Sequence, residues 1–239
     1  MKSGILSGLK NIIVPRGEAP RAIKAGPFRG LRMNLDLVSQ FQIYLGLFER
    51  EVHAKFRMLS ANIATAIDIG AAQGEYTLYF LAKTRAAKIL AFEPSKVSRA
   101  ELLSNLKLNG LASDSRLNIC GQLVGPQDDG NMCSLDSLLP LIEFPCLIKM
   151  DIDGGEAEVL RGAQKLLLKP QVRWLIETHS PELERNSISL LEKFGYETEI
   201  IENAWWRFFI PEQRPIEQNR WLIASKQIPN ILRSDRSRV

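Results

Sequence analysis

Along most of this 239-residue chain, segments with the apolar pattern of a strand alternate with segments with the apolar pattern of a helix. Short apolar runs typical of buried strands occur at residues 63–69, 87–92, 116–120, 146–152, 171–178, 196–202 and 220–225. Apolar residues at helical spacing fill most of the intervals, over about 74–85, 95–109, 155–168 and 182–194. Strands that alternate with helices predict an α/β fold built on a doubly wound, largely parallel sheet.

The residues outside this alternation predict smaller elements. Apolar residues at helical spacing over 3–13 predict a short amphipathic helix, and rough alternation over 26–37 predicts a hairpin. A helical stretch is expected from Val38 to Leu59. Glycine, proline and aspartate make residues 121–145 irregular, with one short helix near Leu135–Leu139.

These patterns divide the chain into three parts. We expect residues 1–60 to form an extension that packs on a domain of residues 61–226, followed by a basic tail of residues 227–239. The net charge is +4, yet residues 1–32 and 226–239 together carry +9, so the rest carries −5. Such basic arms can contact anionic lipid, nucleic acid or a partner, although solvated tails are the simpler interpretation.

Composition narrows the class of protein. Hydrophobic residues make up 45% and charged residues 24%, as in a globular protein with a sizeable core. No apolar run approaches the roughly 18 residues of a membrane-spanning helix, and Lys10 interrupts the apolar N-terminus, so we expect a cytoplasmic protein. Cys120, Cys133 and Cys146 form no CxxC pair, which argues against a disulfide framework or a structural zinc.

A ligand site is predicted where the first strand of the alternating region ends. Gly70 and Gly74 follow this strand and allow a tight turn with a close approach of the backbone to a ligand. Asp68 at the strand tip would repel a dinucleotide pyrophosphate but favours the sulfonium and ammonium groups of S-adenosylmethionine. Glu93 ends the next strand, 25 residues later, where a carboxylate can accept both ribose hydroxyls. The predicted cofactor set also includes the neighbours Ala72, Tyr76 and Pro94.

Ionisable residues gather at the ends of two later strands. Lys149, Asp151 and Asp153 alternate with apolar residues, so period-2 geometry places them on one face. Glu177 and His179 lie 26 residues after the two aspartates, at the end of the next strand. If the strands are neighbours, their tips can bind a divalent ion such as Mg²⁺, with Asp151, Glu177 and His179 as ligands. The predicted catalytic residues are Lys149, Asp151, Asp153 and His179.

Three interpretations of this cluster stay open. The cluster is a metal site, a general base with Asp153 or His179 as proton acceptor, or a hydrogen-bonded group that only orients the loop. Glu156 lies in the first turn of the following helix, where the dipole favours an acid, so we expect a structural role for it. His53 is expected on the surface of the early helix.

Several ordered blocks of the sequence are similar to one family. These blocks are YLGLFE (44–49), IDIGAAQGEYT (67–77), AFEPS, NLKLNG, SLDSLL, LIKMDIDGGEAEVLRGA and ETHS, spread over residues 26–225. The chain resembles the FkbM-like S-adenosylmethionine-dependent methyltransferases. The resemblance implies a class I, Rossmann-like sheet, mostly parallel with an antiparallel last strand, and methylation of a hydroxyl on a sugar or natural product. It adds Tyr44, Glu49 and the region of Asp136 to the cofactor cleft.

The sequence departs from the family pattern at three places. Ala72 stands where the family usually has Asn, Asp153 where it commonly has Glu, and the stretch from Gly125 to Leu135 is short. The first two affect the cofactor loop and the reach of a base, and the third affects substrate size. Loops at residues 121–135 and 203–219 are expected to select the acceptor.

A methyltransferase acting on a small molecule or glycan is the function that these features favour. An RNA methyltransferase, suggested by the basic arms, would need stacking surfaces, and residues 205–209, WWRFF, are the aromatic cluster available. Strand pairing or a pocket wall explains that cluster as well. A binding protein without catalysis is disfavoured by the retained acids. A homodimer is compatible with the sequence.

Overall fold

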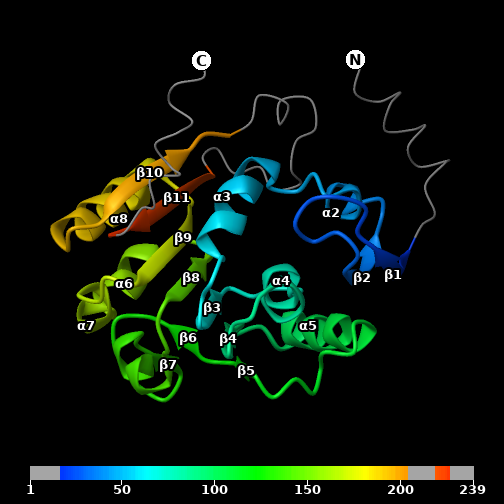
Figure 1. The fold of residues 1–239 in the computed structure, drawn as a ribbon, viewed down its shortest axis with the longest axis horizontal. Helices are drawn as coiled ribbons and strands as arrows, with labels where there is room; N and C mark the ends of the chain where they lie inside the picture. Colours follow the sequence, from blue (N-terminus) through cyan, green and yellow to red (C-terminus); the bar gives the residue numbers. More distant parts are fainter. Residues whose placement is uncertain (1–16, 204–218, 227–239) are drawn as a thin grey trace.

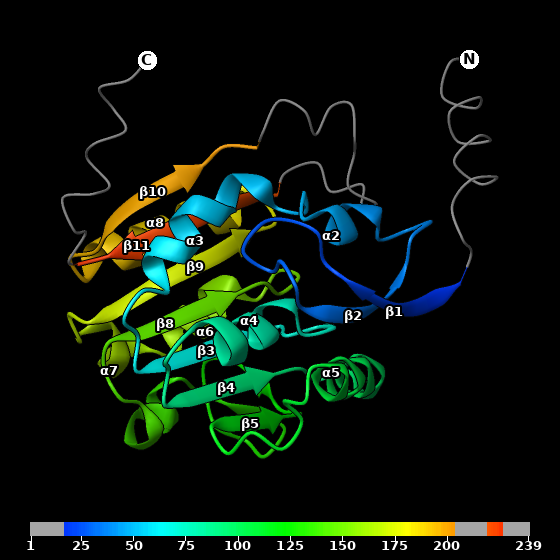
Figure 2. The ribbon, with the colours of Figure 1, turned by 45° about the vertical axis from the view of Figure 1, so that its right-hand side comes forward.

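A mixed sheet forms the centre of the molecule in a computed structural model that describes residues 17–203 and 219–226 (Figure 1). Its strands lie in the order β10 (Glu197–Ile201), β11 (Arg220–Ser225), β9 (Val172–Thr178), β8 (Cys146–Met150), β3 (Thr65–Ile69), β4 (Lys88–Phe92) and β5 (Leu117–Cys120). The strands from β9 to β5 are parallel, whereas β11 is antiparallel to both of its neighbours (Figure 2). The predicted α/β fold with an antiparallel last strand is confirmed.

Helices cover both faces of this sheet and enclose two cores. One face carries α3 (His53–Leu59), α4 (Glu75–Lys83) and α5 (Lys96–Leu108), and the other carries α6 (Glu156–Arg161), α7 (Gln164–Leu167) and α8 (Pro181–Lys193). Alternate residues of each strand serve different cores, with Ala66 and Leu147 in the first and Ile67 and Ile148 in the second. Burial on both faces explains why these strands are continuous apolar runs. Within the described ranges, no helix combines the length and apolar character needed to cross a membrane.

The hairpin before the sheet lies earlier in the sequence than predicted. It pairs β1 (Glu18–Ala22) with β2 (Arg32–Asp36), so the predicted range 26–37 contains only its second strand. The side-chain oxygen of Asn105 on α5 accepts a hydrogen bond of 2.8 Å from the Asn34 backbone N–H. This bond and the burial of β2 side chains in the first core fix the hairpin beside the carboxyl edge of the sheet.

The helix predicted from Val38 to Leu59 is broken, and the prediction of a continuous helix is wrong. The segment forms α2 (Phe41–Leu45), the 3₁₀ helix η1 (Arg50–Val52) and α3. Gly46 ends α2 at φ 70°, where a Cβ atom would lie 2.2 Å from the carbonyl oxygen of Ala25. The chain then turns again at Glu49, whose φ is 50°, and this turn brings the Glu49 carboxylate to the site described below.

Several other boundaries differ from the sequence predictions. The helix predicted at 155–168 is divided at Gly162, where a Cβ would lie 2.0 Å from the Gly125 carbonyl oxygen. The irregular region contains the short strands β6 (Leu123–Val124) and β7 (Met132–Cys133), and its helix is the 3₁₀ helix η2 (Asp136–Leu141). The predictions for residues 3–13, the aromatic cluster 205–209, most of the loop 203–219 and the basic tail fall outside the described residues.

His53 is buried, so its predicted surface position is wrong. The residue is 7% exposed, and its ring packs edge-on against Phe28 at a centroid distance of 5.9 Å. The ring Nε2 donates a hydrogen bond of 2.8 Å to the carbonyl oxygen of Phe48. Burial lowers the pKa of His53 to about 4, and the nearby charges of Arg57 and Arg50 act in the same direction.

This burial predicts a loss of stability in acid. The folded-state pKa of about 4 lies below the ordinary value of 6.5, so the unfolded chain takes up the proton first. The contribution is complete above pH 6.5 and is lost as the pH falls toward 4. Between about pH 7.5 and about pH 4.5, we expect the wild type to lose about 2 kcal/mol more than His53→Gln in urea unfolding. Equal losses in the two proteins would contradict the assignment.

Candidate active site

The turn after β3 joins the two halves of the site. Gly70 has φ 76°, and a Cβ there would lie 1.9 Å from the carbonyl oxygen of Asp151. Gly74 has φ 95°, and its Cβ would lie 2.2 Å from Leu102 Cδ1 on α5. Ala72, between them, is exposed and adopts φ 46°, a left-handed conformation that costs an alanine energy. The backbone therefore lies unusually close to both neighbours and has its accessible side at Ala72.

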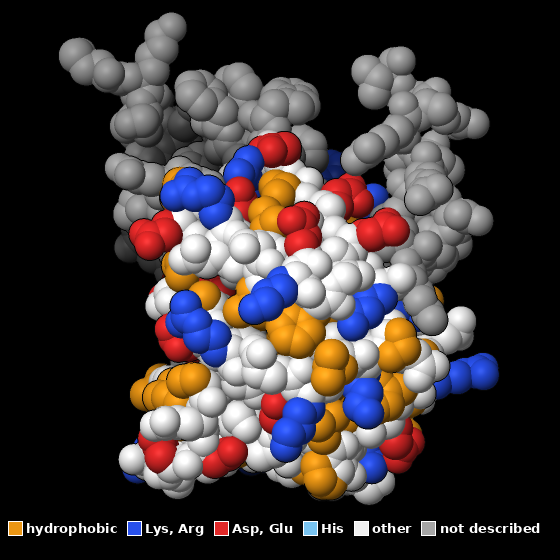
Figure 3. Space-filling view, turned by 90° about the vertical axis from the view of Figure 1, so that its left-hand side faces the viewer, with side chains coloured by type: hydrophobic (Ala, Val, Ile, Leu, Met, Phe, Trp, Pro, Cys, Tyr) orange, Lys and Arg blue, Asp and Glu red, His pale blue; other side chains and the backbone are white. Residues whose placement is uncertain are grey.

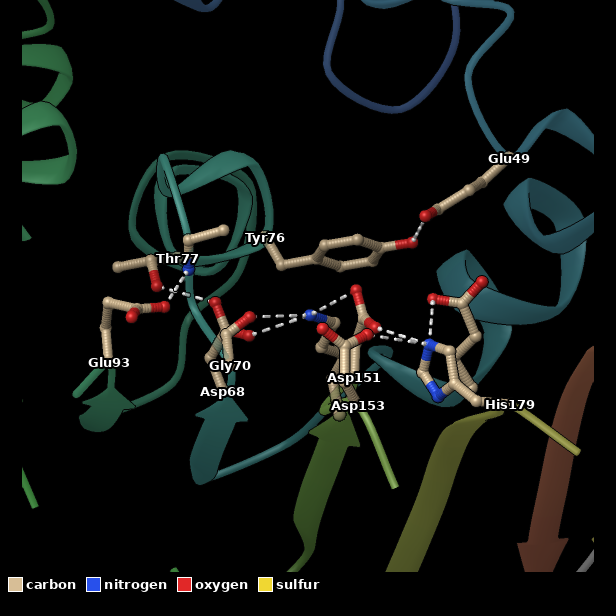
Figure 4. Close-up of polar contacts among 12 residues, drawn as sticks. Glu49, Asp68, Gly70, Tyr76, Thr77, Glu93, Asp151, Asp153 and His179 are labelled. Atoms are coloured by element: carbon tan, nitrogen blue, oxygen red, sulfur yellow. Dashed lines mark hydrogen bonds and ion pairs between the residues drawn. The ribbon is translucent and has the colours of Figure 1, made fainter. Parts of the chain in front are cut away.

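Asp68 is a buried carboxylate at the tip of β3, and only one of its two oxygens accepts a hydrogen bond from a described residue. Its Oδ2 accepts a hydrogen bond of 2.7 Å from Thr77 Oγ1 on α4 (Figure 4). Its Oδ1 has no hydrogen-bond partner among the described residues and lies 3.5 Å from Lys149 Nζ. Burial raises the pKa of Asp68, against the opposing effect of Lys149. The buried Oδ1 of Asp68 can therefore still bind a hydrogen-bond donor or a cation in addition to Lys149.

Glu93 holds the turn from the neighbouring strand. Its Oε2 accepts a hydrogen bond of 2.9 Å from the Ala72 backbone N–H, and its Oε1 accepts one of 2.8 Å from the Ser95 N–H. The intervening Pro94 has no N–H to compete for these oxygens. Each carboxylate oxygen can accept a second bond, so Glu93 still has the capacity to bind two ligand hydroxyls.

Lys149 occupies the centre of the site. Its Nζ donates a hydrogen bond of 3.1 Å to the Gly70 carbonyl oxygen, lies 3.6 Å from Asp151 Oδ2 and lies 4.9 Å from the Tyr76 ring centroid. Burial alone would lower the pKa of Lys149, but the carboxylates around it raise the value, so it is an ammonium at neutral pH. The Tyr76 hydroxyl donates a hydrogen bond of 2.5 Å to Glu49 Oε2 and so links the N-terminal extension to the site.

His179 lies inside a group of acids. Its Nδ1 donates a hydrogen bond of 2.7 Å to Glu156 Oε1. Its Nε2 lies 3.6 Å from Asp151 Oδ1 and 3.7 Å from both Asp153 Oδ1 and Glu177 Oε2 (Figure 4). Strands β8 and β9 are parallel neighbours, so their carboxyl ends meet and the residues that the sequence predicted to gather are together. β8 ends at Met150, however, and the two aspartates lie on the loop after it.

The charges in this group perturb one another. Burial raises the pKa of Glu177, and the adjacent Asp151 carboxylate adds to the effect. Burial alone would lower the pKa of His179, but the hydrogen bond that it donates to Glu156 and the charges of Asp151, Glu156 and Asp153 raise it. The acids therefore stabilise positive charge at the position of the His179 imidazole.

Two residues of the site were not expected from the sequence. Glu156 was expected only to complement a helix dipole, yet it is fully buried and fixes the His179 ring. Glu75, the first residue of α4, is half-buried beside the turn, and burial raises its pKa to about 7. The position of Glu75 directly after Gly74 is the signal that would have identified it. No sequence signal links Glu156 to His179, because their contact depends on the packing of two separate elements.

Asp136 does not belong with these residues, and its predicted place in the cofactor cleft is wrong. Its carboxylate accepts backbone hydrogen bonds from Lys165 and Leu166, of 2.9–3.0 Å, at the start of α7. Helix α7 leads into the amino end of β9, so Asp136 lies at the opposite edge of the sheet from Asp68. Free N–H groups at a helix start account for an acid at this position.

Comparison with known proteins finds one similar family in the C-terminal half of the described chain. Residues 131–203 match the family model of the methyltransferase FkbM domain. In this segment the sequence is similar to the FkbM methyltransferases. The matched residues run from β7 to β10 and include Lys149, Asp151, Asp153, Glu156 and His179. No curated protein matches the sequence significantly.

Solved structures share the fold of the greater part of this chain. The chain is similar to the methyltransferase FkbM of Methylobacillus flagellatus, with a TM-score of 0.52 and 18% identity over 68% of this chain and 43% of that one. It is also similar to precorrin-6y C5,15-methyltransferase of Geobacter metallireducens, with a TM-score of 0.50 and 16% identity over 74% and 88%. A Streptococcus mutans protein in complex with SAH gives a TM-score of 0.51 and 10% identity over 75% and 99%. The chain thus spans under half of the Methylobacillus protein, and the class I methyltransferase fold is shared.

Proposed function

We propose that this FkbM-like chain is an S-adenosylmethionine-dependent O-methyltransferase whose acceptor is a small molecule or a glycan. The observation that carries the proposal is the juxtaposition at one sheet edge of two sets of residues. Asp68, Gly70 and Glu93 form a cofactor-type turn, and the Asp151–His179 cluster lies directly beside it through the contact of Gly70 with the Asp151 backbone. Methyl transfer to a hydroxyl needs both a cation-binding site and a group that takes a proton.

The residues at the turn fit this cofactor. The buried Oδ1 of Asp68 lacks a hydrogen-bond partner within the described ranges, as expected of a group that faces a ligand donor or cation. Glu93 lies where it can accept hydrogen bonds from the ribose hydroxyls. The turn is exposed at Ala72, so its backbone can lie against the ligand there. Bound S-adenosylmethionine supplies a methyl group on a sulfonium, which is an electrophile for a hydroxyl oxygen. The hydrogen bond between Tyr76 and Glu49 lies on the side of the site away from Glu93 (Figure 4).

The acid–histidine cluster fits the acceptor. Asp151 and Asp153 expose 24% and 80% of their side chains, so an acceptor hydroxyl can reach them from solvent. The ammonium of Lys149 fixes the turn and the Asp151 carboxylate relative to each other. The acceptor oxygen forms a bond to the methyl carbon as the carbon–sulfur bond breaks, and the bonding pair leaves with sulfur. Asp153 or His179 takes the hydroxyl proton, and positioning supplies much of the acceleration.

An RNA acceptor is less well supported. A protein that binds the RNA backbone presents a continuous, positively charged surface of Lys and Arg side chains. The face on the left of Figure 1 instead shows Lys and Arg side chains interspersed with Asp and Glu (Figure 3). The acids Asp151, Asp153 and Glu177 also make the acceptor side of the site repel phosphates.

Calorimetric titration of the full chain with S-adenosylmethionine tests the cofactor, with NAD as the parallel control. We expect saturable binding of S-adenosylmethionine alone. Glu93→Gln should weaken it by about tenfold or more, because the amide replaces one accepting oxygen with a donor. The matched variant Glu101→Gln, on the surface of α5, should bind as the wild type does. Absence of binding in folded, ligand-free protein would overturn the proposal, and binding would justify screening hydroxyl acceptors by methyl transfer.

A further inference from the structure

The imidazole of His179 points an unpartnered nitrogen into a group of carboxylates. Its side chain is 8% exposed, and Nε2 is buried with no hydrogen-bond partner among the residues that the structure describes. Three carboxylate oxygens, from Asp151, Asp153 and Glu177, lie 3.6–3.7 Å from it. These distances are too long for hydrogen bonds. A buried polar atom surrounded at such distances needs another group in the space between.

The spacing is compatible with atoms that share one ion, because His179 Nε2 lies 3.6 Å from Asp151 Oδ1 and 3.7 Å from Glu177 Oε2. One ligand atom each from Asp151, Glu177 and His179 lies within 4.8 Å of the other two. Ligand atoms that are each about 2.1 Å from a common ion lie about 3–4 Å apart. The exposed Asp153 leaves one side of the group open to water, which can complete the coordination.

The second ring nitrogen of His179, Nδ1, is held as in metal-binding histidines. Metal-binding histidines commonly donate their other ring N–H to a carboxylate, which fixes the tautomer and the ring orientation. Here Nδ1 donates to Glu156 Oε1 at 2.7 Å, and this carboxylate is fully buried. The bond leaves the Nε2 lone pair directed at Asp151 and Glu177. Glu156 is thus a positioning residue for the ligand face of His179.

The balance of charge also calls for a cation. Asp151, Asp153, Glu156 and Glu177 surround one imidazole, and the neighbouring ammonium of Lys149 is shared between Asp151 and the buried Asp68. Burying several carboxylates together is unfavourable unless cations or protons compensate them. A divalent ion compensates two charges at the point where the oxygens converge.

We propose that Asp151, Glu177 and His179 bind one divalent transition-metal ion of the Mn²⁺ type. A set of carboxylate oxygens with one imidazole nitrogen suits Mn²⁺ better than Mg²⁺, the ion expected from the sequence, because Mg²⁺ prefers oxygen ligands alone. The role of the ion rests on the proposed function. At this place it would draw electron density from the acceptor oxygen and ease the loss of its proton, which leaves Asp153 as the proton acceptor.

Mn²⁺ binding to chelator-treated, ligand-free full chain tests the proposal by electron paramagnetic resonance. We expect about one saturable site per chain, weakened about tenfold or more in both Asp151→Asn and His179→Ala. The matched variant Glu143→Gln, an exposed acid at the opposite edge of the sheet, should bind as the wild type does. Asp151→Asn is isosteric and partly exposed, so it keeps the test valid if His179→Ala does not fold.

Failure of the metal site is distinguishable from failure of the proposed function. No saturable Mn²⁺ binding to the wild type, or binding that neither variant weakens, would overturn the metal site. Titration of the same samples with S-adenosylmethionine tests the cofactor separately. Mn²⁺ binding without S-adenosylmethionine binding supports the metal site and overturns the methyltransferase proposal.

Discussion

Gly70→Ala is expected to lower the free energy of unfolding by about 3–5 kcal/mol and to abolish measurable S-adenosylmethionine binding. The added Cβ would lie 1.9 Å from the Asp151 carbonyl oxygen, which is a backbone atom that cannot rotate away. The left-handed φ of 76° adds a conformational cost for alanine. Urea unfolding and calorimetric titration measure the two effects.

Gly110→Ala is the matched control for this prediction. Gly110 also has a left-handed φ, of 69°, but a Cβ there meets no atom within 4 Å. We expect a loss of only about 1–2 kcal/mol, from conformation alone, with cofactor binding unchanged. Equal losses in the two variants would show that the close approach between Gly70 and the Asp151 backbone does not exist in solution.

Asp151→Asn is expected to lower turnover by about 10³-fold while changing the dissociation constant for S-adenosylmethionine by less than about threefold. The side chain lies between Lys149 Nζ and His179 Nε2, on the acceptor side of the Gly70 turn. Asparagine keeps the shape but removes the charge to which we assign cation binding and orientation of the acceptor. Methyl transfer to an acceptor found by screening gives turnover, and calorimetry gives the cofactor affinity.

The exposed acid Glu143 again provides the control, because Glu143→Gln removes a similar charge far from the site. It should leave turnover and cofactor affinity unchanged. If Asp151→Asn instead loses cofactor binding in proportion to turnover, then Asp151 belongs to the cofactor half of the site. That result would move the acceptor site away from the β8 loop.

Residues at strand tips could be placed from the sequence because parallel topology determines their position. Asp68, Glu93, Asp151 and Glu177 each follow a buried apolar run, and the carboxyl ends of parallel neighbours meet at one edge. Their gathering therefore follows from alternation alone. Their chemical roles do not follow from it and stay predictions.

Features that depend on contacts between distant segments could not be predicted. The break at Gly46 is caused by Ala25, and the burial of His53 by Phe28, which approach only after the hairpin packs. The sequence around Asp136 matches a family block, yet its oxygens bind the start of α7, 29 residues later. Local periodicity carries no information about such partners.

The position of β11 between β9 and β10 determines when the sheet can be completed during synthesis. Strand β10 pairs with β11, and β11 pairs with β9, so residues 197–201 join the sheet only through residues 220–225. Until the ribosome has released that later segment, β9 presents an unpaired edge, which can pair wrongly with other chains. The buried Trp221 must also arrive before the core over Tyr76 closes. The site beside β9 is therefore assembled late, and a chain stopped before Arg220 should aggregate instead of forming a partial site.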